Sequence, residues 1–270
     1  MRKEMNFRDA GGMKTKDGKH IKKGVIFRCG SIGKMSKEEL MEMKESGIRY
    51  ILDLRNTHEV KHHPDPAIEG MEQLPYSHCG TKEGKKVNFG FSGTKHTSAE
   101  CLKHLTQVED YYRKMPYHNE MVKVLFDALL EKKVPVVIHC ASGKDRTGIC
   151  CMLVQKTLGA KNEDILEDYL KSNLAYQEAF EEETEKRKGE IEQVPETLPV
   201  IQMSKGVRKE NHGKCTAGTG TKISGYGNVF TGRIRIYSGT DCKDTELVCR
   251  EIVRKSKRAM LLTCEFHYSF

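Results

Sequence analysis

The sequence predicts an α/β fold, in which a central mixed β-sheet is flanked by helices. Three short runs rich in apolar and β-branched residues predict strands, at residues 25–28, 48–54 and 134–138. Helix-period patterns lie between and after these runs, an order that is typical of a layered architecture of sheet and helices. A chain of 270 residues is long enough for one large domain of this class, or for a domain with an appendage.

The N-terminal part begins with a polar, glycine-rich segment. Residues 6–12 read Asn-Phe-Arg-Asp-Ala-Gly-Gly, which we expect to form a surface turn. The strand at 25–28 comes next. Ser36 is a good N-cap and Glu39 stands at the capping-box position, so a helix is predicted from there to Gly47, a residue type that commonly ends helices.

Four later segments have the periodicity of helices. They are residues 99–115, 118–132, 163–172 and 176–188. The second has a continuous apolar stripe, which we assign to the core. The last is highly charged and has a weak apolar side, so we expect it to be exposed.

The strand at 134–138 leads into the most informative segment of the sequence. Residues 139–147 read His-Cys-Ala-Ser-Gly-Lys-Asp-Arg-Thr, and a turn through Ser142 and Gly143 separates the strand from an apolar helix predicted at 149–158. In a strand–loop–helix unit of this kind, unpaired backbone N–H groups and the positive end of the helix point in the same direction. The segment is therefore predicted to bind an anion.

Cys140 and Arg146 indicate which reaction this predicted anion site could catalyse. Five residues separate them, so the loop can curl around a tetrahedral oxyanion while the planar fork of Arg146 binds two of its oxygens. The same field stabilises a thiolate at Cys140, which would face a bound phosphate for in-line attack and form a thiophosphate. The hydroxyl of Thr147 is placed to hydrogen-bond the sulfur. The alternative is that Cys140 is a buried, inert thiol on a structural turn.

The distribution of charge argues against nucleic acid as a partner. The net charge is +8, but residues 201–270 contain 13 Lys and Arg against 6 Asp and Glu, so +7 of it lies in this C-terminal part. The part that carries the anion-binding loop is close to neutral. A nucleic-acid-binding protein would concentrate positive charge around its site.

Hydropathy and cysteine usage indicate a cytoplasmic protein. The sequence has no run of about 18 apolar residues, so we expect no membrane span. The residues after Met1 are polar, and we expect no signal peptide. Ten cysteines would indicate disulfides only in a small secreted protein, and those of residues 1–200 lack the paired spacing of a metal site. Neither a metal nor a cofactor is predicted.

The loop resembles the phosphate-binding loop of cysteine-dependent phosphatases, His-Cys-x-x-Gly-x-x-Arg-Ser/Thr, at all of its fixed positions. Three motifs precede it in order: Asn-Phe-Arg-Asp-x-Gly-Gly at 6–12, Phe-Arg at 27–28 and Ile-x-Asp-Leu-Arg-x-x-x-Glu at 51–59. Over residues 5–205 the chain is thereby similar to a bacterial and fungal branch of the tyrosine phosphatases. The resemblance implies a phosphotyrosine-phosphatase-like fold and metal-free hydrolysis of phosphate monoesters through a cysteinyl-phosphate. Four charged motif residues are predicted to be structural, as ion pairs under the loop: Arg8, Arg28, Asp53 and Arg55.

The resemblance also implies roles for single residues. Cys140 would be the nucleophile, Arg146 the anion clamp and Asp145 the general acid that protonates the leaving oxygen. Asp110 is an alternative acid, because many tyrosine phosphatases use an Asp upstream of the cysteine at about this spacing, although Asp110 lies within a helical pattern. In a contrary interpretation, Asp145 only holds the shape of the loop. The predicted substrate-binding positions are His139, Ala141, Ser142, Gly143, Lys144 and Thr147.

Two substrate classes and one non-enzymatic function fit these residues. Phosphotyrosine in proteins is the first expectation. Phosphoinositides are the alternative, because Lys144 adds positive charge and loops of the form Cys-x-x-Gly-Lys-x-Arg recur in phosphatases that accept inositol phosphates. A non-catalytic phosphate-binding module is the rival function, although inactive members commonly lack the Cys or the Arg. A sulfur-transfer enzyme is disfavoured by Arg146 and Thr147 at phosphate spacing. The oligomeric state is not predicted.

The C-terminal part differs in character from the rest. We predict a phosphatase domain over residues 1–210 and an atypical basic tail, rich in Cys and Gly, over 211–270. One interpretation of the tail is a small β-rich appendage. We prefer a frameshift near residue 211. When the possible codons from His212 onward are read one base later, they allow an amphipathic helix of the kind with which members of the resembling phosphatase branch end. A nucleotide sequence that forbids this helix would refute the frameshift.

Overall fold

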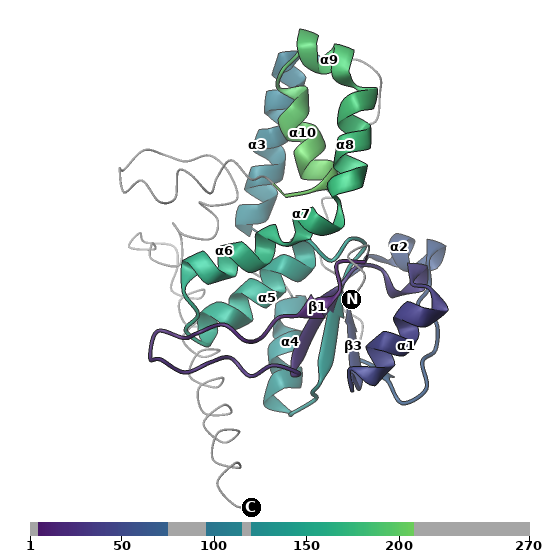
Figure 1. Cartoon of the computed structure of the whole chain (residues 1–270), viewed down its shortest axis with the longest axis vertical. Coiled ribbons are helices and arrows are strands. Elements are labelled where there is room, and N and C mark those ends of the chain that lie inside the picture. The colour runs from purple at the N-terminus through teal and green to yellow at the C-terminus, as the bar shows by residue number, and fades with distance from the viewer. Residues whose placement is uncertain (1–4, 75–95, 115–119, 208–270) are drawn as a thin grey trace, which may run out of the picture. The chain divides into compact units, whose positions relative to one another are not determined.

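The computed structural model describes residues 5–74, 96–114 and 120–207 (Figure 1). These residues fall into two compact units. Residues 5–74 and 120–161 belong to the first unit, and residues 96–114 and 162–207 to the second. The predicted tail at 211–270 lies outside the described residues.

The first unit is built on a five-stranded sheet with the strand order β1-β2-β5-β3-β4. Its strands are β1 (Arg8–Asp9), β2 (Ile26–Cys29), β3 (Tyr50–Asp53), β4 (Glu72–Gln73) and β5 (Val136–His139). β1 pairs antiparallel with β2, and the other neighbours pair in parallel. The predicted mixed sheet is confirmed. Because β2, β5 and β3 run in parallel, their carboxyl ends meet at one edge of the sheet, where α/β proteins place their sites.

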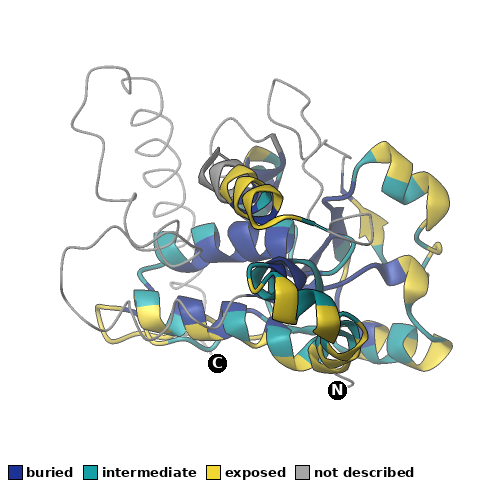
Figure 2. Ribbon diagram, turned by 90° about the horizontal axis from the view of Figure 1, so that it is seen from above, coloured by how far each residue is buried: buried dark blue, intermediate teal, exposed yellow. Residues whose placement is uncertain are grey.

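Helices cover both faces of this sheet (Figure 1). They are η1 (Ile32–Lys34), α1 (Lys37–Glu45), α2 (Thr57–His62), α4 (Glu120–Leu130) and α5 (Asp145–Thr157). Leu52 and Ile138 face a buried cluster that includes side chains of α4 and α5. Ile51 and Val137, the alternate positions of the same strands, face a second cluster with Met43 of α1. Strand residues point alternately to the two faces, so the sheet is buried on both sides (Figure 2).

The second unit consists of helices. They are α3 (Ser98–Lys114), α6 (Asn162–Leu170), α7 (Ser172–Ala175), α8 (Gln177–Lys186), α9 (Lys188–Gln193) and α10 (Thr197–Lys205). α10 packs against α3, α8 and α9. α8 has no buried residue, as its charged pattern predicts. The side-chain oxygen of Asn173 accepts the backbone N–H of Val207 at 2.6 Å, which fixes the segment after α10.

Local sequence signals place most of these elements correctly. The side chain of Ser36 accepts from the Glu39 N–H at 3.2 Å and Glu39 accepts from the Ser36 N–H at 2.7 Å, so the predicted capping box is formed. Gly47 follows α1 with a φ of +75°, the conformation that favours glycine at a helix end. The prediction differs at α5, which begins at Asp145 instead of residue 149. The polar residues that were assigned to the loop form its first turn.

None of the helices within the described ranges combines the length and the apolar character needed to cross a membrane.

Candidate active site

The predicted anion-binding loop connects β5 to α5 at the carboxyl edge of the sheet. Cys140 follows the last residue of β5 directly and is 2% exposed. Gly143 lies at the turn with a φ of +61°. A Cβ atom at this position would lie 2.2 Å from the carbonyl oxygen of Cys29 and 2.6 Å from the backbone nitrogen of Gly30. The loop can therefore lie against the end of β2 only because residue 143 is glycine.

Replacing Gly143 by alanine should displace the loop, since the obstacle is backbone and the φ is left-handed. A displacement of about 1 Å at a reacting centre costs roughly 100-fold in rate, and we expect a loss of that size in kcat/KM. Gly189→Ala is the matched control, because a Cβ there meets nothing within 4 Å. Steady-state kinetics on a phosphate monoester would measure both, and wild-type activity in Gly143→Ala would contradict the prediction.

Two side chains from the N-terminal part hold the loop by its carbonyl groups. Asn6 donates from Nδ2 to the carbonyl oxygens of Gly143, at 2.9 Å, and Ser142, at 3.4 Å. Arg28 donates from Nη2 to the carbonyls of Gly143, at 2.9 Å, and Lys144, at 3.4 Å. Arg28 is 1% exposed, so these bonds form away from solvent, where a charged donor strengthens them.

The direction of these carbonyls fixes the direction of the loop amides. In a planar trans peptide, the carbonyl group and the following N–H point in opposite directions. Because the carbonyls of residues 142–144 point toward Asn6 and Arg28, the N–H groups of residues 143–145 point away from them, to the other side of the loop. Successive amides with a common direction form an anion-binding nest.

The Asn-Phe-Arg-Asp-Ala-Gly-Gly segment is more than the predicted surface turn. Arg8 donates to the backbone oxygen of Asn6, at 3.2 Å, and to its side-chain oxygen, which leaves Nδ2 directed at the loop. Asp9 accepts the N–H groups of Gly11, at 2.7 Å, and Gly24, at 2.6 Å. The segment thus orients one side chain that supports the site.

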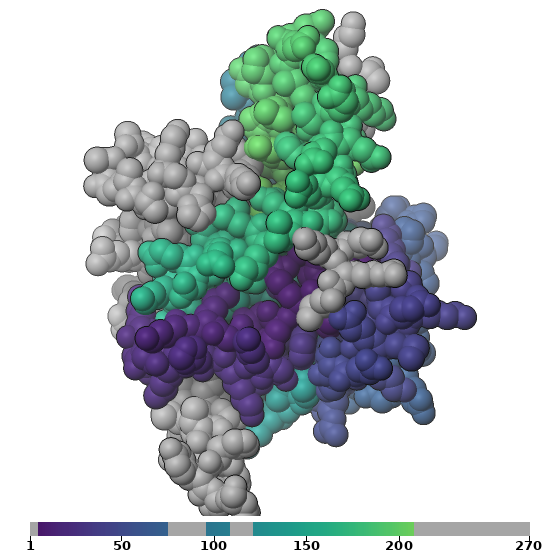
Figure 3. Space-filling view, viewed as in Figure 1, coloured from purple at the N-terminus to yellow at the C-terminus, as the bar shows by residue number. Residues whose placement is uncertain are grey.

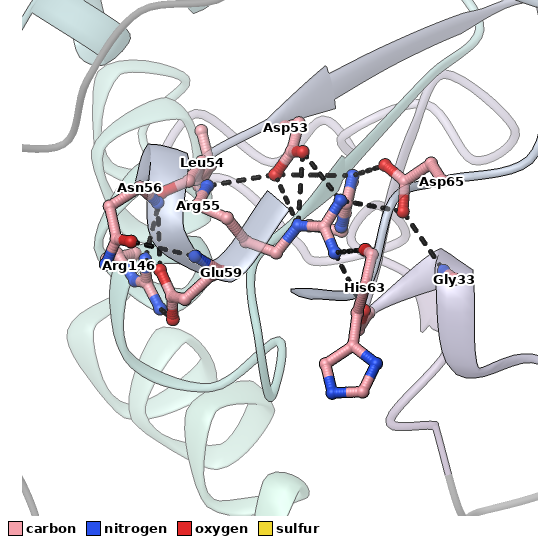
Figure 4. Close-up of polar contacts among 11 residues, drawn as sticks. Gly33, Asp53, Leu54, Arg55, Asn56, Glu59, His63, Asp65 and Arg146 are labelled. Atoms are coloured by element: carbon pink, nitrogen blue, oxygen red, sulfur yellow. Dashed lines mark hydrogen bonds and ion pairs between the residues drawn. The ribbon is translucent and has the colours of Figure 1, made fainter. Parts of the chain in front are cut away.

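Arg146 lies in the first turn of α5 and is paired with Glu59 of α2 (Figure 4). Its Nη1 donates to Oε2 and its Nη2 to Oε1, both at 2.7 Å, and Nη1 also donates to the Leu54 carbonyl at 3.1 Å. The two terminal nitrogens of the guanidinium thus contact both carboxylate oxygens in a two-pronged pair. Burial opposes ionisation of Glu59, but hydrogen bonds and charge from Arg146 outweigh it and hold the pKa of Glu59 below its usual value. The charged carboxylate in turn fixes the orientation of the arginine.

A group of buried charged side chains lies at the carboxyl ends of β3 and β5 (Figure 4). Arg55 donates from Nε to both oxygens of Asp53, at 2.9 and 3.1 Å, and its Nη2 lies 2.8 Å from Asp65. It also donates to the Ser31 hydroxyl at 2.9 Å. His139 is fully buried, and its Nε2 lies 3.0 Å from Oδ2 of Asp65. The end of β5, directly before Cys140, therefore lies against these carboxylates.

The charges of this group support one another. Burial raises the pKa of Asp65, but its contact with His139 and the charge of Arg55 outweigh this and lower the pKa below the usual range. Ligand atoms of Asp53, Asp65 and His139 lie within 4.8 Å of one another, close enough to share a cation. Arg55 already supplies positive charge to both carboxylates, so a metal ion would have to displace a buried guanidinium. We interpret the group as structural.

Replacing Arg55 by alanine should destabilise the protein by about 3–5 kcal/mol, because it leaves the carboxylates of Asp53 and Asp65 buried without their shared partner. Urea unfolding measures the change. Arg49→Ala, at an exposed position, is the control and should stay within about 0.5 kcal/mol of the wild type. Equal unfolding midpoints for the two variants would contradict this account of the network.

Asp145 and Lys144 lie side by side at the start of α5. Both are buried, at 8% and 3% exposure, and Nζ of Lys144 lies 3.9 Å from Oδ2 of Asp145. The Oδ1 atom of Asp145 is buried and has no hydrogen-bond partner among the described residues. Buried polar atoms usually have a hydrogen-bond partner, so this unpaired oxygen needs an explanation. A role in proton transfer to a substrate would explain it.

The structure differs from the prediction at Thr147. Its hydroxyl is buried and makes no hydrogen bond to the Cys140 sulfur or to another described residue.

Cys29, on the neighbouring strand, is fully buried, and burial raises the pKa of this thiol well above its usual value, with further contributions from Asp65 and Cys140. Cys29 is accordingly a packed, neutral side chain.

The alternative acid, Asp110, belongs to the helix α3 in the second unit. Its side chain is outside what the structure describes. Ala141, Ser142 and Gly143 all lie on the loop itself.

Sequence reasoning missed two functional partners. Glu59 is noted in the sequence only as part of a motif, and its capping box with Asn56 is a local signal for the start of α2 but not for the pair with Arg146. Asp65 lies between two prolines in a segment without periodicity, and no signal in the single sequence indicates that it reaches His139.

The fold is that of an α/β protein in which the loop between β5 and α5 begins with a cysteine, Cys140, and leads to an arginine, Arg146, in the first turn of the helix. The chain belongs to the tyrosine phosphatase family, whose model matches residues 1–225. The match ends within the region for which a tail was predicted.

Two curated proteins are similar to this chain. The triple specificity protein phosphatase PtpB of Mycobacterium tuberculosis is 27% identical over 187 residues, which cover 62% of this chain and 66% of the relative. A putative tyrosine-protein phosphatase of Cupriavidus necator is 26% identical over 168 residues, covering 62% of this chain and 60% of the relative. The chain thus spans slightly less than two thirds of the length of these relatives.

Proposed function

We propose that the chain is a cysteine-dependent phosphatase that hydrolyses phosphate monoesters, with phosphotyrosine in proteins as its first substrate. The observation that carries the proposal is the common direction of the amides of residues 143–145, on a loop that begins at Cys140. An array of amides and an arginine held by Glu59 suit an oxyanion with three equatorial oxygens. Family membership supports the same reaction.

In the first step, the Cys140 thiolate attacks phosphorus in line with the leaving oxygen. The S–P bond forms as the P–O bond to the substrate breaks, and Asp145 gives its proton to the leaving phenolate. The loop amides and Arg146 stabilise the charge that develops on the equatorial oxygens.

In the second step, water attacks the cysteinyl-phosphate. The O–P bond forms as the S–P bond breaks, and the proton of the water passes to the Asp145 carboxylate. Inorganic phosphate leaves, and the thiolate and the protonated carboxyl are restored. His139, held by Asp65, positions the strand end from which Cys140 extends.

Phosphoinositides are the second substrate class of the proposal. Lys144 adds a buried positive charge to the loop, which favours substrates with more than one phosphate. The relative named a triple specificity phosphatase supports a site that accepts more than one class of phosphate ester.

The proposal places catalysis in residues 1–210, and the protein in the cytoplasm. The cysteines that the structure describes are buried thiols and not disulfides, which suits a reducing compartment. Residues 211–270 remain assigned to a tail that takes no part in the chemistry.

The test is release of inorganic phosphate by the full chain from a phosphotyrosine peptide, p-nitrophenyl phosphate and a phosphatidylinositol phosphate, each with and without EDTA. We expect the phosphotyrosine peptide and p-nitrophenyl phosphate to be hydrolysed equally well with EDTA, because neither step of the proposed reaction uses a metal. No turnover of any substrate would overturn the proposal. Turnover of the lipid alone would transfer it to the phosphoinositide class.

Asp145→Asn separates the two candidate acids. General acid catalysis contributes roughly 100-fold to 10,000-fold, and we expect a loss of this size with phenyl phosphate, whose leaving group needs the proton. With p-nitrophenyl phosphate, a better leaving group, the loss should be smaller. Asp110→Asn is the matched control and should show no such dependence on the leaving group. The opposite pattern would assign the acid to Asp110.

A further inference from the structure

The helix α2 carries a pair of histidines that the reaction does not use. His58 and His62 are both exposed and stand four residues apart, so they share one face of the helix. With Glu59 they form the sequence His-Glu-Val-Lys-His at residues 58–62. The segment that includes α2, slate blue in Figure 3, lies at the surface of the molecule.

The two imidazoles converge on one point. Their Nε2 atoms are 3.2 Å apart, their ring centroids are 4.3 Å apart and their planes meet at 53°. Zinc binds histidine nitrogen at about 2.0–2.1 Å, so two nitrogens on one tetrahedral ion are separated by about 3.3 Å. The observed distance between the two Nε2 atoms is close to this value. One dication can be bound by both rings with little movement of either.

The intervening glutamate decides what such an ion could do. In His-Glu-x-x-His metallopeptidases, the glutamate is the general base for a metal-bound water. Here the Glu59 oxygens accept from Arg146, and Oε2 also accepts the Asn56 N–H at 2.8 Å. Glu59 is thus engaged in holding the arginine and the start of α2. The pair suits metal binding and not peptide hydrolysis.

We propose that His58 and His62 form a surface site for a borderline divalent transition-metal ion, such as Zn²⁺ or Ni²⁺, with water at the remaining positions. Imidazole is the ligand type that these ions share. The ion bridges consecutive turns of α2, so it binds only where that helix is formed and stabilises the folded state. Through Glu59 the same helix supports Arg146, which places the metal site on an element of the phosphatase machinery.

The experiment is a calorimetric titration of the full chain with Ni²⁺, chosen because thiolates compete more strongly for zinc. Wild type is compared with His58→Gln, His62→Gln and His63→Gln, the last as the control for an exposed neighbouring histidine. Loss of an outer-shell partner alone costs metal sites about 10-fold to 100-fold in affinity. We expect His58→Gln and His62→Gln each to weaken the site by at least about 10-fold, and His63→Gln to leave it unchanged.

A second readout is the thermal midpoint. It should rise with Ni²⁺ concentration in the wild type and in His63→Gln, and rise less in the other two variants. The proposal would be overturned if His58→Gln bound Ni²⁺ as tightly as the wild type, or if His63→Gln lost as much Ni²⁺ affinity as the other two variants. The two histidines would then be only a hydrogen-bonded pair. Circular dichroism and metal-free turnover confirm that each variant is folded, since none of these side chains takes part in the chemistry.

Discussion

Cys140→Ser should abolish turnover while leaving the protein folded and able to bind substrate. Removing a catalytic nucleophile costs about a million-fold in kcat, because a serine hydroxyl in the same place has no base to activate it. The loop is held by Asn6 and Arg28 through backbone carbonyls, which the substitution does not touch. Binding and turnover are therefore separable in this variant.

Two measurements check this expectation. Phosphate release from p-nitrophenyl phosphate should fall to the background rate, and a phosphotyrosine peptide should remain bound without being consumed. Cys101→Ser removes another buried thiol, in the second unit, and should retain full activity. If Cys140→Ser keeps more than about a thousandth of the wild-type rate, the cysteinyl-phosphate pathway is wrong. If the wild type binds the peptide but does not hydrolyse it, the chain is a binding module.

Arg146→Lys should lower kcat by about 1,000-fold to 100,000-fold, the contribution of arginines that stabilise phosphoryl transfer. Lysine keeps the charge but lacks the planar fork, so it can neither pair with both oxygens of Glu59 nor bind two phosphate oxygens at once. Both the orientation of the cation and its grip on the transition state are lost. Stability should change little, since the pair is partly exposed, at 15% and 26%.

Arg187→Lys is the matched control for this variant. Arg187 makes a similar two-pronged pair with Glu190, through Nε and Nη2 at 2.8 Å, in the second unit. Its substitution tests whether losing an arginine–glutamate fork disturbs activity by itself. Kinetics with p-nitrophenyl phosphate should show wild-type kcat for Arg187→Lys. A comparable drop in both variants would remove Arg146 from the proposed site.

The elements that sequence predicts well are those governed by neighbouring residues. The β2, β3 and β5 runs are short and apolar because both faces of the sheet are covered, and α1 begins at a complete capping box. β1 and β4 have two residues each, too few to show any periodicity. The apolar pattern predicts the start of α5 too late in the sequence, because the first turn of this helix is polar. The polar residues of that turn are placed by contacts of Asp145 with Lys144 and of Arg146 with Glu59, so the missing apolar pattern does not mark a helix boundary.

The sequence predicts the loop from its own residues, and it predicts four charged motif residues as ion pairs under the loop. It does not predict that Asn6 and Arg28 hold the loop by donating to its carbonyls. Cys140, Gly143 and Arg146 follow one another at fixed spacing, which a single sequence displays. The Arg146 contact with Glu59 spans 87 positions, and pairing over such distances leaves no trace in local pattern. Its detection required the fold.

The attachment of the loop to Asn6 has a consequence for how the protein matures. Asn6 and Gly143 are 137 positions apart, and Arg28 and Gly143 are 115 apart. Contacts of such separation form late, because the entropy of closing the intervening chain has to be overcome first. During synthesis, Asn6 and Arg28 therefore leave the ribosome long before the loop residues that they contact. We therefore expect the loop after β5 to become ordered only when the N-terminal segment and the segment from β5 to α5 have come together.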